Sequence, residues 1–329
     1  MYNRNFNDAY IGGGYSKVSG VNLIYGIVIN SLCNTGVSLF VLISGYFGMK
    51  FNIRKIISIE LTTVFYALLT LAVKYVCGLP VTVKEVFYSF FPVSSRIYWY
   101  ITSYMLLMIF SDYINLIPEK LSKKSFQKLI LIMLIIFSVL PSIIQVHIMG
   151  DAGKGVLNML LIYLIGRYLK KYDIQIKSSI KLIISIILLL GVEILVNYLC
   201  SMLRGGIGIY APFARDCSIF IVILSVLIFL YFKKIELVSP FINMVAKNII
   251  GIYLFESAVR IVIYIKFDIS QYLDKWYLFA EVLGVGLIVF VLCTLIESIR
   301  RNTIGHVEDF ISSFIEKKIY ALKNSKHWL

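Results

Sequence analysis

A glutamate and an arginine stand four residues apart inside an apolar stretch near the C-terminal third of the sequence. Glu256 and Arg260 have aliphatic and aromatic residues on both sides. Residues at i and i+4 lie on one face of a helix, so the spacing predicts an ion pair within one turn. Such a pair either neutralises two charges in an apolar helix or provides a carboxylate base with a cationic partner. Glu256 and Arg260 are therefore candidate catalytic residues.

A histidine pattern offers a second candidate base. His147 opens the segment HIMGD, in which Asp151 follows four residues later. In soluble acyl-transfer enzymes an HxxxD pattern supplies a general base and the carboxylate that orients it. The same spacing arises by chance in short glycine-rich loops, and both interpretations stay open. The sequence has no GxSxG elbow, P-loop, GxGxxG pattern or metal-ligand spacing, so we expect no metal site and no bound cofactor.

A compact basic turn, Lys50 with Arg54 and Lys55, separates two apolar runs. Basic turns of this kind orient membrane proteins, and they also hold phosphate groups. In both interpretations the turn lies at the inner, cytoplasmic face of the membrane.

Aromatic residues follow a second basic residue, Arg96, at the start of another apolar run. Tyr98, Trp99 and Tyr100 either form an interfacial aromatic belt or provide rings that stack on a sugar. A further run carries polar residues on one helical face, where they pack between helices or line a cavity. These residues are Asn30, Asn34, Ser38 and, beyond them, Ser44.

The composition shows which solvent surrounds these groups. The chain has 329 residues, of which 59% are hydrophobic and 15% are charged, and its mean hydropathy is +0.85. One soluble core cannot bury this much apolar surface, so the sequence predicts an all-α, polytopic transmembrane helix bundle. The net charge of +14 lies in loops between apolar runs, which is the pattern of membrane topology. We therefore expect membrane lipid and not nucleic acid as a partner.

About nine apolar runs are long enough to be membrane spans. The expected spans are residues 27–48, 56–76, 98–117, 129–146, 156–169, 182–199, 211–232, 249–265 and 277–299. Strict alternation then places most of the 32 basic residues on the inner side. Without the short span 156–169, the basic segment 167–181 would lie outside, so this span is retained.

The alternation divides the chain into three parts. Residues 1–26 form an extracytoplasmic segment, 27–299 the transmembrane domain, and 300–329 a cytoplasmic tail. Apolar residues at helical spacing in the tail predict an amphipathic interfacial helix. The five cysteines have no regular spacing; Cys200 and Cys217 flank one outer loop and either pair or remain buried thiols.

Several motifs resemble those of the acyltransferase 3 family, bacterial multi-pass membrane O-acyltransferases. The resemblance covers about residues 20–299 and depends mainly on the order of the motifs. They are VSLFVLISGYFG at 37–48 with Ser44-Gly45-Tyr46, the basic turn of Lys50, Arg54 and Lys55, YWYITSY at 98–104, and IGIYLF at 250–255.

The resemblance implies an acyltransferase, acting on groups other than aminoacyl groups, in the bacterial cell membrane. Its co-substrate is an acyl-CoA, commonly acetyl-CoA, and its acceptor is a hydroxyl of a cell-surface or exported polysaccharide. In this interpretation Lys50, Arg54 and Lys55 bind the donor phosphates. The acceptor, or the cavity that admits it, is lined by Ser44, Trp99 and Tyr100.

The sequence departs from the family in two respects. The family has ten spans, and its first helix carries an arginine and the catalytic histidine; this sequence begins after that helix, so we expect impaired transfer. Glu256 stands where the late motif often has histidine, which leaves Glu256 or His147 as a substitute base. The competing function is a non-enzymatic glycan-lipid transporter or scaffold.

Overall fold

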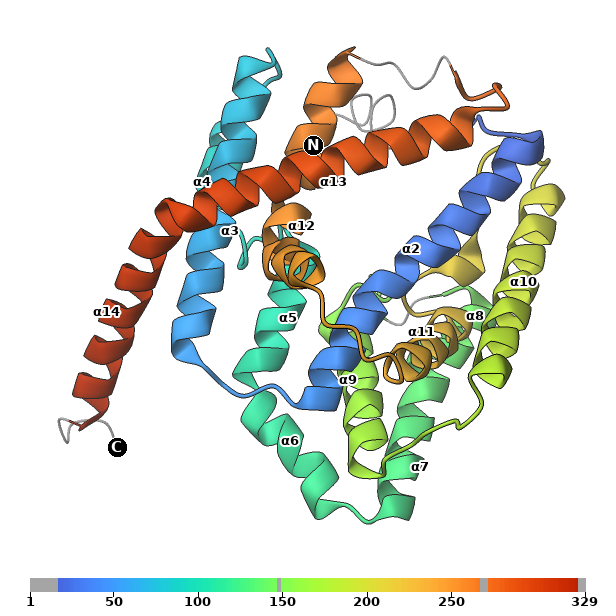
Figure 1. Ribbon diagram of the computed structural model, residues 1–329, viewed down its shortest axis with the longest axis horizontal. Helices are drawn as coiled ribbons and strands as arrows, with labels where there is room; N and C mark the ends of the chain where they lie inside the picture. The colour runs from blue at the N-terminus through green and yellow to red at the C-terminus, as the bar shows by residue number, and fades with distance from the viewer. Residues whose placement is uncertain (1–16, 147–148, 267–271, 325–329) are drawn as a thin grey trace. The chain divides into compact units, whose positions relative to one another are not determined.

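The chain is helical throughout the part that the structure describes. The computed structural model describes residues 17–146, 149–266 and 272–324, and these residues contain no strand (Figure 1). The predicted all-α class is therefore confirmed. His147 and the N-terminal sixteen residues lie outside the described residues.

The helices belong to two compact units, which are described separately. Unit 1 comprises Met1–Phe51, Ser103–Leu237 and Ile269–Phe279, and unit 2 comprises Asn52–Thr102, Val238–Asp268 and Ala280–Leu329. The helices of unit 1 are α2 (Gly20–Phe47), α6 (Ser111–Lys120), α7 (Lys123–Leu134), α8 (Leu140–Ile144), α9 (Val156–Lys171), α10 (Ser179–Leu203) and α11 (Ile219–Phe232), with the 3₁₀ turn η3 (Pro212–Ala214). Those of unit 2 are α3 (Ile53–Val76), α4 (Val83–Ser89), α12 (Pro240–Lys266), α13 (Leu278–Asn302, from Ala280 on) and α14 (Ile304–Asn324). The remaining helix, α5 (Trp99–Ile109), begins in unit 2 and ends in unit 1.

Several helices suit a bilayer. Among the described residues, five helices are long and apolar enough to cross a membrane, and a bent pair gives a sixth. Each predicted span coincides with a helix or a broken helix, and α9 confirms that 156–169 is helical. The number of crossings, about nine, stays a prediction.

Two predicted spans contain breaks. The run 98–117 forms α5 and α6, which meet at Phe110 with a bend of 61°. In the run 129–146, a π-helical turn, Ile135–Val139, precedes Pro141, where the missing N–H and the proline ring disturb the regular hydrogen bonds. A third run, 211–232, begins later than predicted, because Pro212 starts a 3₁₀ turn and Ser218 caps α11.

Helices α2 and α9 pack through glycines. A Cβ atom on Gly45 would overlap the backbone of Tyr163, and one on Gly166 would overlap the backbone of Leu42 and Tyr46. Small residues allow such backbone contact between membrane helices. The Ser-Gly-Tyr motif found in the sequence thus has a packing role, because Gly45 lies at the helix contact.

Gly45→Ala is expected to destabilise the chain by about 1–3 kcal/mol, because the added methyl group forces α2 and α9 apart. The matched control is Gly36→Ala, since Gly36 lies in the same helix and a Cβ atom there would have no neighbour within 4 Å. Thermal unfolding in detergent compares the two variants. Equal midpoints for Gly45→Ala and Gly36→Ala would contradict the packing.

The predicted amphipathic tail is the helix α14. Its packed side is polar, with Glu308 and Ser312 buried, whereas Phe310 and Phe314 are exposed. Thr62 of α3 donates a hydrogen bond to Glu308, at 3.0 Å. Polar groups therefore hold α14 against α3 and α13 within unit 2, and its aromatic side remains open.

Candidate functional site

Unit 2 brings together two sets of residues that the sequence analysis singled out. Tyr98 and Tyr100, at the start of α5, lie 6.2 and 5.6 Å from the ring of Tyr253 on α12. Trp99 contacts Tyr100 edge to face, with ring centroids 6.2 Å apart. Glu256 follows Tyr253 by three residues, so it lies on the same side of α12. We call Tyr98, Trp99, Tyr100, Tyr253, Glu256 and Arg260 the aromatic–carboxylate cluster.

The predicted ion pair within α12 is present. Arg260 donates to Glu256 at 3.2 Å, and both side chains are about one third exposed. The Arg260 Nε atom is buried without a hydrogen-bond partner among the described residues, so the guanidinium can still donate. The cluster therefore places a charge-balanced carboxylate beside aromatic rings, which are suited to a polar acceptor with an apolar face.

Unit 1 contains a basic cluster that the sequence analysis did not identify. The ring of Tyr46, at the end of α2, has the ammonium groups of Lys170 and Lys233 at 5.0 and 5.1 Å. Arg167 lies one turn before Lys170 on α9, and its Nε atom is buried without a partner among the described residues. We call Tyr46, Arg167, Lys170 and Lys233 the Tyr46 basic cluster.

One carboxylate partly balances this cluster. Lys233 donates to Asp173 at 3.1 Å. Hydrogen bonds from Gln175 and Lys233 lower the pKa of Asp173. For Lys233, desolvation is outweighed by hydrogen bonds to Tyr46 and Asp173, so its pKa is raised. The three cations of the cluster outnumber this one carboxylate, so the cluster can bind a further anionic group.

Hydrogen bonds fix the end of α2 that carries Tyr46. The Met49 amide donates to the Tyr163 hydroxyl at 3.0 Å, and that hydroxyl donates to Asn115 at 2.7 Å. Asn115 in turn donates to the Met49 carbonyl at 2.7 Å. At Gly48, where φ is 81°, a Cβ atom would meet the Arg167 guanidinium. The positive φ favours a glycine at this position.

The predicted basic turn is divided between the two units. Lys50 is exposed in the segment after α2, whereas Arg54 and Lys55 lie in the first turn of α3. Arg54 is 3.9 Å from Asp309, and both side chains are largely exposed. Asn52 caps α3 by accepting from the Lys55 amide at 2.9 Å. Phosphate binding by Lys50, Arg54 and Lys55 stays a prediction.

The polar face of α2 serves mainly in helix packing. Asn34 donates to Asn30 at 2.9 Å and to the Ala214 carbonyl at 2.5 Å. Ser44 donates to the Phe40 carbonyl one turn back, at 2.9 Å. Ser44 as an acceptor-binding residue stays a prediction, and so does His147 as a base.

The cysteines form no disulfide, so Cys200 and Cys217 do not pair with each other. Among the described residues, no group of three or more His, Cys, Asp or Glu side chains could hold a metal ion.

Comparison with known families gives one match. A family model described as an acyltransferase domain, Acyl_transf_3, matches residues 7–298. No curated protein and no solved structure matches the chain. The matched range includes both the aromatic–carboxylate cluster and the Tyr46 basic cluster.

Proposed function

The chain belongs to the acyltransferase 3 family of membrane acyltransferases, and we propose that it transfers an acyl group from an acyl-CoA to a hydroxyl of a cell-surface or exported polysaccharide. The proposed donor is acetyl-CoA, which acts as a co-substrate. Membrane lipid surrounds the helices, and the bacterial cell membrane is the proposed location.

The observation that carries the proposal is the Tyr46 basic cluster. An acyl-CoA presents several phosphate groups, and charged hydrogen bonds from lysine and arginine are the usual means of binding them. Arg167, Lys170 and Lys233 come from the ends of α9 and α11 that the charge pattern places on the inner side. Acyl-CoA is available on that side. Lys50, three residues beyond the end of α2, is exposed.

The aromatic–carboxylate cluster is the proposed acceptor side of the reaction. Trp99 and Tyr100 offer rings on which a sugar stacks. Glu256 accepts the proton of the attacking hydroxyl, while Arg260 balances the carboxylate charge before the proton arrives. The oxygen then attacks the thioester carbon, and the carbon–sulfur bond breaks as the ester forms.

Replacing Lys170 and Lys233 together by alanine is expected to weaken CoA binding at least tenfold. Each charge-assisted contact contributes about 1.5–3 kcal/mol when formed, and partial exposure reduces this value here. Calorimetric titration of the detergent-solubilised chain with CoA measures the affinity. Lys124→Ala, an exposed lysine on α7, is the matched control. Unchanged CoA affinity in the double variant would show that the donor does not bind at the Tyr46 basic cluster. Replacing Lys50, Arg54 and Lys55 together by alanine would then test whether the donor binds at the basic turn.

Topology gives an independent test. A reporter that works only in the cytoplasm, fused after Leu329, is expected to be active, and a cysteine at Lys170 to be protected from an impermeant reagent added outside. The control is a cysteine at Arg204, which precedes η3 on the proposed outer side. Labelling of the cysteine at position 170 from outside would show that the chain has the opposite orientation to the one proposed.

A further inference from the structure

Helix α10 carries a buried carboxyl group that the proposed reaction does not use. Glu193 and Asn197 are both completely inaccessible to solvent. Asn197 donates to Glu193 Oε1 at 2.5 Å and accepts from the Phe213 amide at 2.9 Å. Glu193 Oε2 is buried and has no hydrogen-bond partner among the described residues. One half of the carboxyl group is therefore held in place, and the other half is unsatisfied.

Helix α2 places the hydroxyl group of Ser31 next to this carboxyl group. Ser31 of α2 is fully buried beside Glu193, and its own proton is donated to the Ile27 carbonyl at 2.9 Å. The Ser31 oxygen can therefore accept a proton from Glu193 Oε2. Ser38 lies two turns further along the same face of α2 and is also buried with an unpartnered oxygen.

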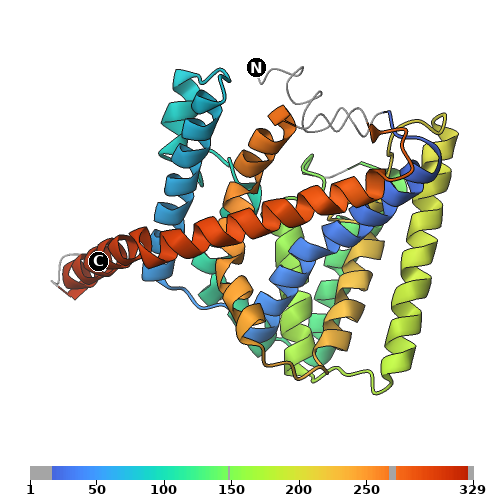
Figure 2. The same ribbon diagram turned by 45° about the horizontal axis from the view of Figure 1, so that its top comes forward.

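No cation balances Glu193 within the described residues. The elements packed around it are α2, α11 and η3, and Figure 2 shows α10 beside α11 in unit 1. Arg215, which follows η3, donates to Gln145 at 3.2 Å. The titratable or charged residues on these elements and on α10, apart from Glu193, are Tyr25, Cys33, Tyr46, Lys181, Tyr198, Cys200 and Tyr231. Those in the segment between α10 and α11 are Arg204, Tyr210, Arg215, Asp216 and Cys217.

An ionised carboxylate in this position would be buried without a counter-ion, which is costly, whereas a protonated one has a hydrogen to donate. We propose that Glu193, with Asn197 and Ser31, forms a proton-binding site inside the contact between α10 and α2. In this site Glu193 holds a proton, donates it toward Ser31, and can release it. Glu256 differs from Glu193 because Arg260 balances its charge.

The site has a use in acyl transfer, and this part of the inference rests on the proposed function. The acceptor O–H bond and the C–S bond of the thioester break, and a C–O bond and an S–H bond form. One proton therefore passes from the acceptor oxygen to the sulfur of CoA. A buried acid that can release and take up a proton is suited to take part in this proton transfer.

A purely structural role for Glu193 would be to orient Asn197 and, through it, the Phe213 turn. Glu193→Gln separates the two roles, because the glutamine oxygen still accepts from Asn197 but the amide cannot release a proton. Asn197→Leu is the complementary variant, since it removes the tether to Phe213 and keeps the acid.

Infrared difference spectroscopy of the full chain in lipid vesicles tests the site. At neutral pH the wild-type spectrum is expected to contain a carboxylic acid carbonyl band that shifts in D₂O and is absent in Glu193→Gln. It is expected to disappear reversibly as the pH is raised. A spectrum unchanged by Glu193→Gln, or a band that does not respond to D₂O, would overturn the proposal.

The transfer rate tests the use of the proton. Glu193→Gln is expected to lower the rate at least tenfold with CoA affinity unchanged, and Glu193→Asp to restore part of it. A wild-type rate for Glu193→Gln across the pH range would refute a role in transfer. If the wild-type chain transfers no acyl group, the proposed function fails, while the infrared result still decides whether the proton site exists.

Discussion

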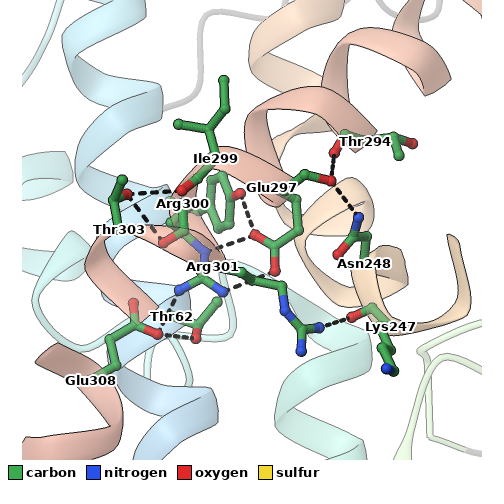
Figure 3. A network of polar contacts seen from close by, with 12 residues as sticks. Thr62, Lys247, Asn248, Thr294, Glu297, Ile299, Arg300, Arg301, Thr303 and Glu308 are labelled. Atoms are coloured by element: carbon green, nitrogen blue, oxygen red, sulfur yellow. Dashed lines mark hydrogen bonds and ion pairs between the residues drawn. The ribbon is translucent and has the colours of Figure 1, made fainter. Parts of the chain in front are cut away.

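Arg300→Met is expected to destabilise the chain by about 3–5 kcal/mol, the cost typical of removing one partner from a buried ion pair. Arg300 of α13 is 7% exposed and lies between two buried carboxylates. It donates to both oxygens of Glu297, at 2.7 and 2.8 Å, and to Glu308 of α14 at 2.5 Å (Figure 3). Methionine would leave both acids without their cation.

The carboxylates have further partners, which fix the geometry of the network. Tyr66 of α3 donates to Glu297 at 2.6 Å, and Thr62, one turn before it, donates to Glu308. Gly251 of α12 leaves room for the Glu297 side chain, which a Cβ atom there would strike. The network thus joins α3, α13 and α14 within unit 2.

Chemical or thermal unfolding of the purified chain measures the effect. The neighbouring Arg301→Met is the matched control, because Arg301 is exposed and its hydrogen bond goes to the Lys247 carbonyl. We expect Arg301→Met to lower the free energy of unfolding by less than about 1 kcal/mol. A second variant, Arg300→Met with Glu297→Gln and Glu308→Gln, removes the unpaired charges and is expected to recover part of the loss. Equal unfolding midpoints for Arg300→Met and Arg301→Met would contradict the account.

Glu256→Gln is expected to lower the rate of acyl transfer by roughly 10²–10⁴-fold, the usual contribution of a general base. Glutamine keeps the size of the side chain and its hydrogen bond from Arg260, but it cannot take up a proton. Initial rates with labelled acetyl-CoA and polysaccharide, measured in vesicles, give the effect. Because the proposed donor site is the Tyr46 basic cluster, the affinity of Glu256→Gln for CoA is expected to equal that of the wild type.

Glu281→Gln is the control for this substitution, since it changes an exposed acid in the first turn of α13. Its rate is expected to equal that of the wild type. If Glu256→Gln and Glu281→Gln both keep the wild-type rate, Glu256 is not the base, and the ion pair with Arg260 only neutralises charge within α12. His147→Gln then tests the other candidate.

The helices could be predicted because apolar runs are a local property of the sequence. The bend at Phe110 and the π-helical turn before Pro141 could not, since hydropathy does not show how a helix is broken. The Gly45 contact is also hidden in the sequence: its motif is recognisable, but its partner Gly166 lies on a helix more than a hundred residues later.

The same distinction applies to the sites. The Glu256–Arg260 pair was predictable because i and i+4 are neighbours on one helix. The Tyr46 basic cluster combines residues of α2, α9 and α11, and in the sequence each of its lysines is indistinguishable from a residue of an orienting loop. Glu297 stands alone near a span end in the sequence, because nothing local links it to Tyr66 or Glu308.

Acyl transfer by the purified chain can be measured in lipid vesicles. Vesicles containing residues 1–329 receive labelled acetyl-CoA and a polysaccharide from cells that lack other acyltransferases, and ester-linked label on the polysaccharide is counted. We expect label above that of empty vesicles, strongly reduced in Glu256→Gln and in the Lys170→Ala, Lys233→Ala double variant, but not in Lys124→Ala. Wild-type label no higher than that of empty vesicles, in a chain that is folded and inserted, would contradict the proposed acyl transfer.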